Sequence, residues 1–234
     1  MKTADFIRKY DACPASAKWA LSISDDMADV WDALIAQDKH DWLIWTVTRP
    51  GVFPDSVLRK LACRFVRETP LADGRKVWDL LTDERSRMAV EVSERYVDGN
   101  ATVDELSAAY DSARDASAAA EADEVAAYAA ANAAYAAANA AHAAASARSA
   151  ARAASWAAEA SAAYSANAAA ANAAYAAAFS VARAADCVVC AVGYVARAAA
   201  DADHTDAYAA AYDAAKSAQV KTIAELGNPF NQKE

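Results

Sequence analysis

The stretch VAAYAAANAAYAAANAAHAAA, residues 125–145, decides the fold of this chain because it is built almost entirely from alanine. Alanine accounts for 36 of the 60 residues from 121 to 180. It has the highest helix propensity of any residue, since it loses no side-chain entropy on folding. No proline interrupts residues 71–228, and Gly193 is the only glycine between residues 100 and 226. The sequence therefore predicts helix throughout this region.

The length of the alanine-rich region implies that it folds back. A single helix over residues 102–223 would be about 180 Å long at roughly 1.5 Å per residue. Aspartate, serine and asparagine compete with the helical backbone for hydrogen bonds, and their clusters predict turns near Asp115–Glu124, Ser146–Ser155 and Asp201–Asp206. We expect residues 101–234 to form an alanine-rich antiparallel helical bundle resembling a coiled coil. Because alanine buries little area, a second copy of the chain would extend the buried interface, which predicts a homo-oligomer.

Residues 1–100 have a more ordinary globular composition, with five of the six tryptophans and four of the five prolines. Short apolar runs at helical spacing alternate with proline and glycine stop signals, which predicts five or six helices and no strand. Helix starts are expected at Asp25 or Asp26, at Asp55 or Ser56, at Thr82-Asp83, and at the capping-box pattern Thr102-Val103-Asp104-Glu105. The predicted fold class is all-α, with a small helical domain over residues 1–100 and the long-helix bundle over residues 101–234.

The excess of acidic residues limits the function. The chain has 23 lysines and arginines against 32 aspartates and glutamates, a net charge of −9. General nucleic-acid binding and membrane-surface binding both need a positive field, so we expect neither. No apolar run is long enough to span a membrane, and the N-terminus lacks a signal-peptide core. Four cysteines do not make a disulfide framework in a chain of this length. These features predict a cytoplasmic protein with reduced thiols.

An internal repeat places aromatic and amide side chains on one helix face, because Tyr128, Tyr135 and His142 are seven residues apart. The candidate ligand-binding residues of this stripe are Tyr128, Asn132, Tyr135, Asn139, His142, Trp156, Asn167, Asn172 and Tyr175. Two interpretations are open. In the first, the rings fill gaps between alanine-faced helices and the asparagines fix their register. In the second, the rings line a groove and stack on a flat, nucleotide-like ligand whose edges the amides bind.

A second candidate site is basic. Lys60, Arg64 and Arg67 lie on one helix face, and Arg75 follows shortly after them. Guanidinium groups suit phosphate or carboxylate ligands, so these four residues are a candidate anion-binding site. The alternative is a solvated helix face whose cations pair with neighbouring carboxylates such as Glu68.

No catalytic or metal-binding pattern stands out. The pair His40-Asp41 is expected in a short loop, without a serine or cysteine nearby in sequence. The C-x-x-C formed by Cys187 and Cys190 lies inside an apolar helical run and lacks the two further ligands that a zinc site needs. It also lacks the strand-to-helix context of a redox motif. We expect no enzyme activity, no cofactor and no metal.

Residues 67–87, RETPLADGRKVWDLLTDERSR, resemble a recurrent segment of uncharacterised alanine-rich helical proteins of bacteria and their phages. Residues 41–45, DWLIW, and 48–52, TRPGV, are similar to the same group, so the resemblance covers about residues 38–110. The order of a short helical region and an alanine-rich one also resembles the Imm5-like immunity proteins. The tail departs from the first group by using tyrosine and asparagine in place of repeated tryptophan, aspartate and arginine. The resemblance implies a mobile-element setting, in which small accessory proteins act by binding.

Two functions are expected from these features. The first is a non-enzymatic binding protein, encoded by a phage or another mobile element, that acts on a host or competitor protein in immunity or defence. The second is a small-molecule-binding protein that sequesters a nucleotide-type signal in a helical groove lined by tyrosine, asparagine and histidine.

Overall fold

In a computed structural model of the chain, the described residues are 1–71, 74–81, 83–120, 185, 188–189 and 204–231. These residues form eight α-helices and one short 3₁₀ helix, and they contain no strand. The predicted all-α fold class is confirmed for this part of the chain. No helix within the same residues is long and apolar enough to cross a membrane.

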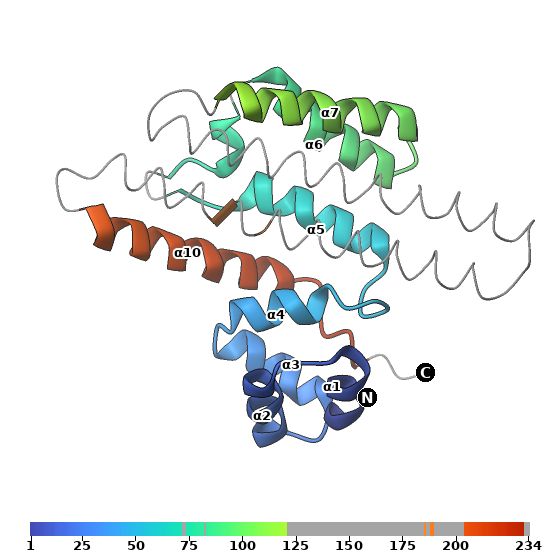
Figure 1. The fold of residues 1–234 in the computed structure, drawn as a ribbon, viewed down its shortest axis with the longest axis vertical. Coiled ribbons are helices and arrows are strands. Elements are labelled where there is room, and N and C mark those ends of the chain that lie inside the picture. Colours follow the sequence, from blue (N-terminus) through green and yellow to red (C-terminus); the bar gives the residue numbers. More distant parts are fainter. Residues whose placement is uncertain (72–73, 82, 121–184, 186–187, 190–203, 232–234) are drawn as a thin grey trace, which may run out of the picture.

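Four short helices form one end of the molecule (Figure 1). They are α1 (Thr3–Tyr10), α2 (Pro14–Ile23), α3 (Met27–Ala36) and α4 (His40–Val47). Apolar residues at helical spacing give each helix a face that packs inward. In α3 the buried residues of this face are Met27, Val30, Trp31 and Leu34.

The middle and the opposite end are built from longer elements. They are α5 (Asp55–Glu68), the 3₁₀ helix η1 (Val77–Leu80), α6 (Glu84–Val97) and α7 (Val103–Ala120). Figure 1 shows α5 in the middle of the molecule, with α6 and α7 together at the end away from α1–α3. Because only a short connection joins α6 to α7, the two helices pack as an antiparallel pair.

The last helix is α10 (His204–Ala224). It packs against α3, α4 and α5, and in Figure 1 it lies alongside α4 and α5. Its buried residues recur every three or four positions and so form one stripe, made of Ala211, Ala215, Gln219, Val220 and Ile223. Gln219 is the one polar residue of this stripe.

Three of the four predicted helix starts carry a side-chain cap, whereas α5 begins at Asp55 as predicted but has no side-chain cap. The carboxylates of Asp26 and Asp83 each accept a hydrogen bond from the backbone N–H two residues further on, over 3.1 and 2.9 Å, at the starts of α3 and α6. Thr102 and Glu105 form the predicted capping box. The Thr102 N–H donates to the Glu105 carboxylate over 2.7 Å, and the Glu105 N–H donates to the Thr102 hydroxyl over 3.2 Å. These contacts satisfy backbone donors that the helix itself leaves free.

The predicted turns have mixed outcomes. Helix α7 continues to Ala120, so the turn expected near Asp115–Glu124 is wrong for residues 115–120. The alanines around Asp115 favour helix more strongly than one aspartate and one serine oppose it. Residues 204–206 of the turn expected near Asp201–Asp206 are helical and belong to α10, whereas residues 201–203 lie outside the described residues. The expected turn near Ser146–Ser155 lies outside the described residues.

One buried core is shared by helices on both sides of residue 100. Its members, each at most 4% exposed, include Phe6, Trp31, Leu61, Phe65, Leu106, Val220 and Ile223. Helices α7 and α10 therefore both pack on helices of the N-terminal part. The predicted division into residues 1–100 and 101–234 is not tested by these contacts and stays a prediction.

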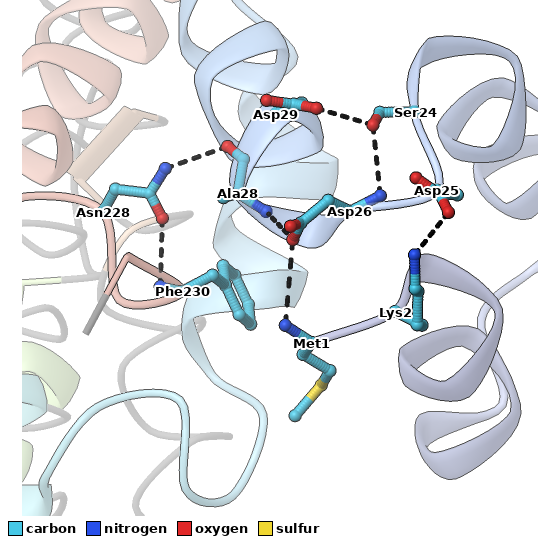
Figure 2. Close-up of polar contacts among 9 residues, drawn as sticks. All are labelled: Met1, Lys2, Ser24, Asp25, Asp26, Ala28, Asp29, Asn228 and Phe230. Carbon is cyan, nitrogen blue, oxygen red and sulfur yellow. Dashed lines mark hydrogen bonds and ion pairs between the residues drawn. The ribbon is translucent and has the colours of Figure 1, made fainter. Parts of the chain in front are cut away.

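The start of the chain is attached to the segment that precedes α3 (Figure 2). The ammonium group of Met1 lies 3.7 Å from the Asp26 carboxylate, and Lys2 pairs with Asp25 over 2.5 Å. Backbone hydrogen bonds reinforce this attachment, since the Met27 N–H donates to the Met1 carbonyl over 3.0 Å. The first residues are thus held in an extended bridge beside α3.

The residues after α10 reach the same region from the other side. The Asn228 amide donates to the Ala28 carbonyl over 2.9 Å, and its oxygen accepts from the Phe230 N–H over 3.0 Å (Figure 2). The ring of Phe230 contacts Phe6 and Trp31, with centroid separations of 5.5 and 6.2 Å. Residues from both ends of the described chain therefore converge on α3.

Candidate functional site at the junction of α4 and α10

Polar side chains from distant parts of the sequence meet where α10 crosses the start of α4. We call this place the α4–α10 junction and define it by Asp38, His40, Asp41, Lys216, Ser217 and Gln219. Asp38 has a positive φ of 51°, a conformation that aspartate tolerates better than most residues. It reverses the chain between α3 and α4, so that His40 and Asp41 occupy the first turn of α4.

His40 is the first residue of α4 and is only 8% exposed. The expectation that His40-Asp41 lies in a short loop is therefore wrong, because the reversal at Asp38 needs few residues and the helix starts directly after Lys39. The Nδ1 atom of His40 lies 2.9 Å from Oδ1 of Asp41, and its Nε2 atom lies 2.7 Å from Oε1 of Gln219.

An ion pair lies beside this histidine. The ammonium group of Lys216 donates to Oδ1 of Asp41 over 2.9 Å. Desolvation alone would raise the pKa of Asp41, but hydrogen bonds from His40 and Lys216 outweigh it and hold the pKa of this carboxyl below its ordinary value. Burial would lower the pKa of Lys216, whereas the hydrogen bond and charge of Asp41 raise it. Both groups are therefore charged at neutral pH. The Ser217 hydroxyl donates to the Asp38 carboxylate nearby.

An open depression of about 570 Å³ borders the junction. Its lining is mostly charged and comprises Asp38, Lys39, His40, Asp41, Trp42, Asp213 and Lys216. The volume is within the range of small-molecule sites, but such sites are usually apolar. Three carboxylates and two ammonium groups suit a charged group or a polar protein segment better than an apolar ligand. Within the described residues, no group of three or more His, Cys, Asp or Glu side chains is placed to hold a metal ion.

A second hollow, of about 30 Å³, lies among α1, α2, α3 and α4. Apolar side chains line most of it, including Phe6, Trp19, Met27, Trp42 and Trp45. It has room for little more than one or two water molecules. We therefore regard it as imperfect packing rather than as a binding site.

At least three residues of the candidate anion-binding site are paired with carboxylates of the chain, namely Lys60, Arg64 and Arg67. Lys60 lies 2.9 Å from Asp98. Arg64 donates to Glu68 over 2.7 Å and to Glu225, just beyond α10, over 2.5 Å. The contact with Glu68 that the alternative interpretation expects is present at Arg64. An external anion at this place would have to displace a carboxylate.

Arg67 is paired with a carboxylate of another helix and also stacks on an aromatic ring. Its guanidinium donates two hydrogen bonds to Glu94, over 2.6 and 2.7 Å, and these raise its pKa. The same guanidinium stacks 3.9 Å from the ring centre of Trp78, whose ring also lies 5.7 Å from Arg87. Arg75 is exposed in the turn between α5 and η1. Anion binding at this cluster stays a prediction.

The two described cysteines differ in their surroundings, and neither forms a disulfide. Burial raises the pKa of the Cys63 thiol, so this side chain acts as a small apolar group. Cys13 is exposed at the start of α2, and a hydrogen bond with the Ser16 hydroxyl lowers its pKa. Cys187 and Cys190 lie outside the described residues, but Val188 and Val189 between them are helical and fully buried.

All nine residues of the tyrosine and asparagine stripe, from Tyr128 to Tyr175, lie outside the described residues. Both interpretations of the stripe therefore stay open. Sequence reasoning also missed the partnership of His40 with Gln219, because 179 residues separate them. The available signal was Gln219 itself, a long polar side chain in line with small apolar residues of the same helix.

No protein-family model, no curated protein sequence and no solved structure matches this chain. The resemblance to alanine-rich helical proteins of bacteria and phages stays an expectation.

Proposed function

We propose that this chain is a non-enzymatic binding protein, encoded by a phage or another mobile element, that acts on a host or competitor protein in the cytoplasm. The observation that supports this most is the attachment of the alanine-rich region to one core at both ends. Helix α7 packs along α6, and α10 packs against α3, α4 and α5. A helical surface held at both ends by a folded core is preorganised, which reduces the entropy lost when a partner binds.

The arrangement that we propose for residues 101–234 is an antiparallel, coiled-coil-like bundle. The described parts of the region, α7 up to Ala120 and α10 from His204, pack on the same core. Residue 185 contacts α10 as well, since the Gln219 amide donates to the Ala185 carbonyl over 2.9 Å. These contacts support a chain that folds back on itself rather than one continuous rod.

The partner that we propose has a basic surface. The net charge of −9 creates a negative field, and such a field speeds association with positive partners. On α7, the aspartates Asp104, Asp111 and Asp115 are exposed and recur at seven and four residues, on one helix face. This acidic face belongs to the helix that leads into the alanine-rich region.

Purification of the tagged full chain from its natural host cells tests the proposal. We expect a basic protein to be retained at low salt and released as salt rises, because charge steering is screened. The variant Asp111→Lys/Asp115→Lys should lose most of this retention, and Asp111→Asn/Asp115→Asn should lose part of it. Unchanged helical circular dichroism in both variants is the control. Retention that neither variant reduces would contradict a role for the acidic face.

The asparagines of the stripe distinguish the proposed function from its alternative. We also propose a homo-oligomer in which Asn132 and Asn139 fix helix register, so replacing both with alanine should change assembly or lower stability. A buried amide left without its partner costs about 1–3 kcal/mol. Native mass spectrometry reports assembly and any co-purified small molecule together. Intact assembly and stability with loss of a bound small molecule would instead favour sequestration of a nucleotide-type signal.

A further inference from the structure

The outer face of α6 carries an exposed methionine between two glutamates. Met88 is 45% exposed. Glu84 precedes it by four residues and Glu91 follows it by three, so the three side chains share one side of the helix. Together with Arg87 they line an open hollow of about 490 Å³. Isolated exposed apolar side chains are common on protein surfaces, so the meaning of Met88 depends on its two acidic neighbours.

The carboxylates of this outer face are not neutralised by the arginines beside them. Within the part of the chain that the structure describes, the side chains of Glu84 and Glu91 make no ion pair or hydrogen bond. Arg87 instead donates to a backbone carbonyl over 2.5 Å. Arg95, four residues after Glu91, lies 3.9 Å from Glu105 on α7. Two negative charges therefore remain uncompensated on either side of Met88.

Neighbouring carboxylates of the same region show the opposite behaviour. Glu94 accepts two hydrogen bonds from Arg67, over 2.6 and 2.7 Å. Asp83 lies 2.7 Å from Arg85. The fold thus pairs the carboxylates on either side of the outer face with its own arginines, and leaves those of the outer face available to cations from outside.

A basic amphipathic helix fits both the charge and the apolar centre of this face. Lysine or arginine side chains seven residues apart lie on one side of such a helix, which is the separation of Glu84 and Glu91 on α6. An apolar residue between them would cover Met88, as in other contacts where a helix lays its apolar side on a partner. The flexible thioether of methionine adapts well to a contacting side chain.

We propose that the outer face of α6, defined by Glu84, Met88 and Glu91, is the docking surface for a basic amphipathic helix of the partner. The inference rests on the proposed function for the basic character of that partner. It adds a defined contact, with an apolar centre, to the acidic face of α7. Because α6 packs along α7, one partner can contact both helices.

The test titrates the full chain with a synthetic amphipathic helix of leucine and lysine, about 15 residues or roughly four turns long. Calorimetry measures the binding, and the same peptide with glutamate in place of lysine is the control ligand. We expect the lysine peptide to bind and the glutamate peptide not to bind. Glu84→Gln/Glu91→Gln should weaken binding roughly tenfold at low salt, the effect of two exposed ion pairs. This difference should disappear at about 0.5 M salt, because salt screens exposed charges.

Two further variants separate the docking surface from the overall charge of the chain. Met88→Gln should weaken binding severalfold at low and at high salt alike, because an apolar contact is not screened. Asp11→Asn/Asp213→Asn removes the same number of charges from exposed residues outside α6, and it should bind as the parent does. Unchanged helical circular dichroism in all variants shows that each is folded.

Several results would overturn the proposal. One is a parent chain that does not bind the lysine peptide, and another is equal weakening by the two double variants, which would show attraction to net charge alone. A loss found only with Asp111→Asn/Asp115→Asn would place the peptide on α7 and leave the proposed function standing. An oligomer that Met88→Gln dissociates would assign the face to a second copy of the chain. Peptide binding that depends on the outer face, with no basic host protein retained, would contradict the proposed function and support the docking surface.

Discussion

Replacing Trp31 with alanine is expected to lower the free energy of unfolding by about 3–5 kcal/mol, the range for a large buried aromatic side chain. Trp31 is 1% exposed. Its ring lies 5.8 Å from that of Phe53, before α5, and 6.2 Å from that of Phe230, after α10. Because these three rings belong to separate segments, removing the central one leaves a cavity that no single rotamer change fills. Urea denaturation followed by circular dichroism measures the loss.

Two further variants control this experiment. Leu21→Ala removes a side chain that is 54% exposed, and its expected effect is within about 0.5 kcal/mol. Trp31→Phe keeps a ring in the core and should lose less than Trp31→Ala. If Trp31→Ala were as stable as Leu21→Ala, Trp31 would not lie in the core and the docking of Phe230 on α3 would be wrong.

The helices of the N-terminal part could be predicted because their signals are local. Asp26 caps α3 through a hydrogen bond to a backbone N–H two residues away, and Thr102 caps α7 through Glu105 three residues away. Such contacts depend on residue types at fixed short spacings. The buried face of α3 follows in the same way from its apolar period.

The α4–α10 junction could not be predicted for the opposite reason. Its contacts join residues that are distant in sequence, such as Asp41 with Lys216, 175 residues apart, and Asp38 with Ser217, 179 apart. No spacing rule relates the partners, since they meet only after α10 packs across α4. Because the chain reverses at Asp38, the loop between α3 and α4 is shorter than the polar residues suggested. His40 therefore lies in the first turn of α4, where it is buried.

The basic cluster shows where composition alone falls short. The sequence correctly places Lys60, Arg64 and Arg67 at helical spacing on α5. The pairing of Arg64 with Glu68 is local and could be expected at a spacing of four residues. The partner Glu94 of Arg67 lies on α6 and depends on how that helix packs. The structure thus pairs three cations of this patch with carboxylates, namely Lys60, Arg64 and Arg67.

Replacing Ile223 with alanine is expected to lower the free energy of unfolding by about 2–5 kcal/mol. We expect this loss to destabilise helices on both sides of residue 100. Ile223 is 0% exposed on α10, the helix that packs against α3, α4 and α5. Loss of its side chain therefore removes packing from the N-terminal helices as well as from α10. The control Lys221→Ala changes an exposed neighbour and should leave stability nearly unchanged.

Two spectroscopic probes show whether Ile223→Ala destabilises residues 1–100 together with the rest of the chain. In a Trp156→Phe background, all remaining tryptophans lie within residues 1–100, so fluorescence reports that part alone while circular dichroism reports helix throughout the chain. Because α10 shares its core with the N-terminal helices, Ile223→Ala should lower the urea midpoint equally by both probes, as in a single cooperative transition. A variant that shifted the circular dichroism midpoint but left the fluorescence midpoint in place would show two independently folding units. That result would support the division at residue 100 and contradict a cooperative core spanning it.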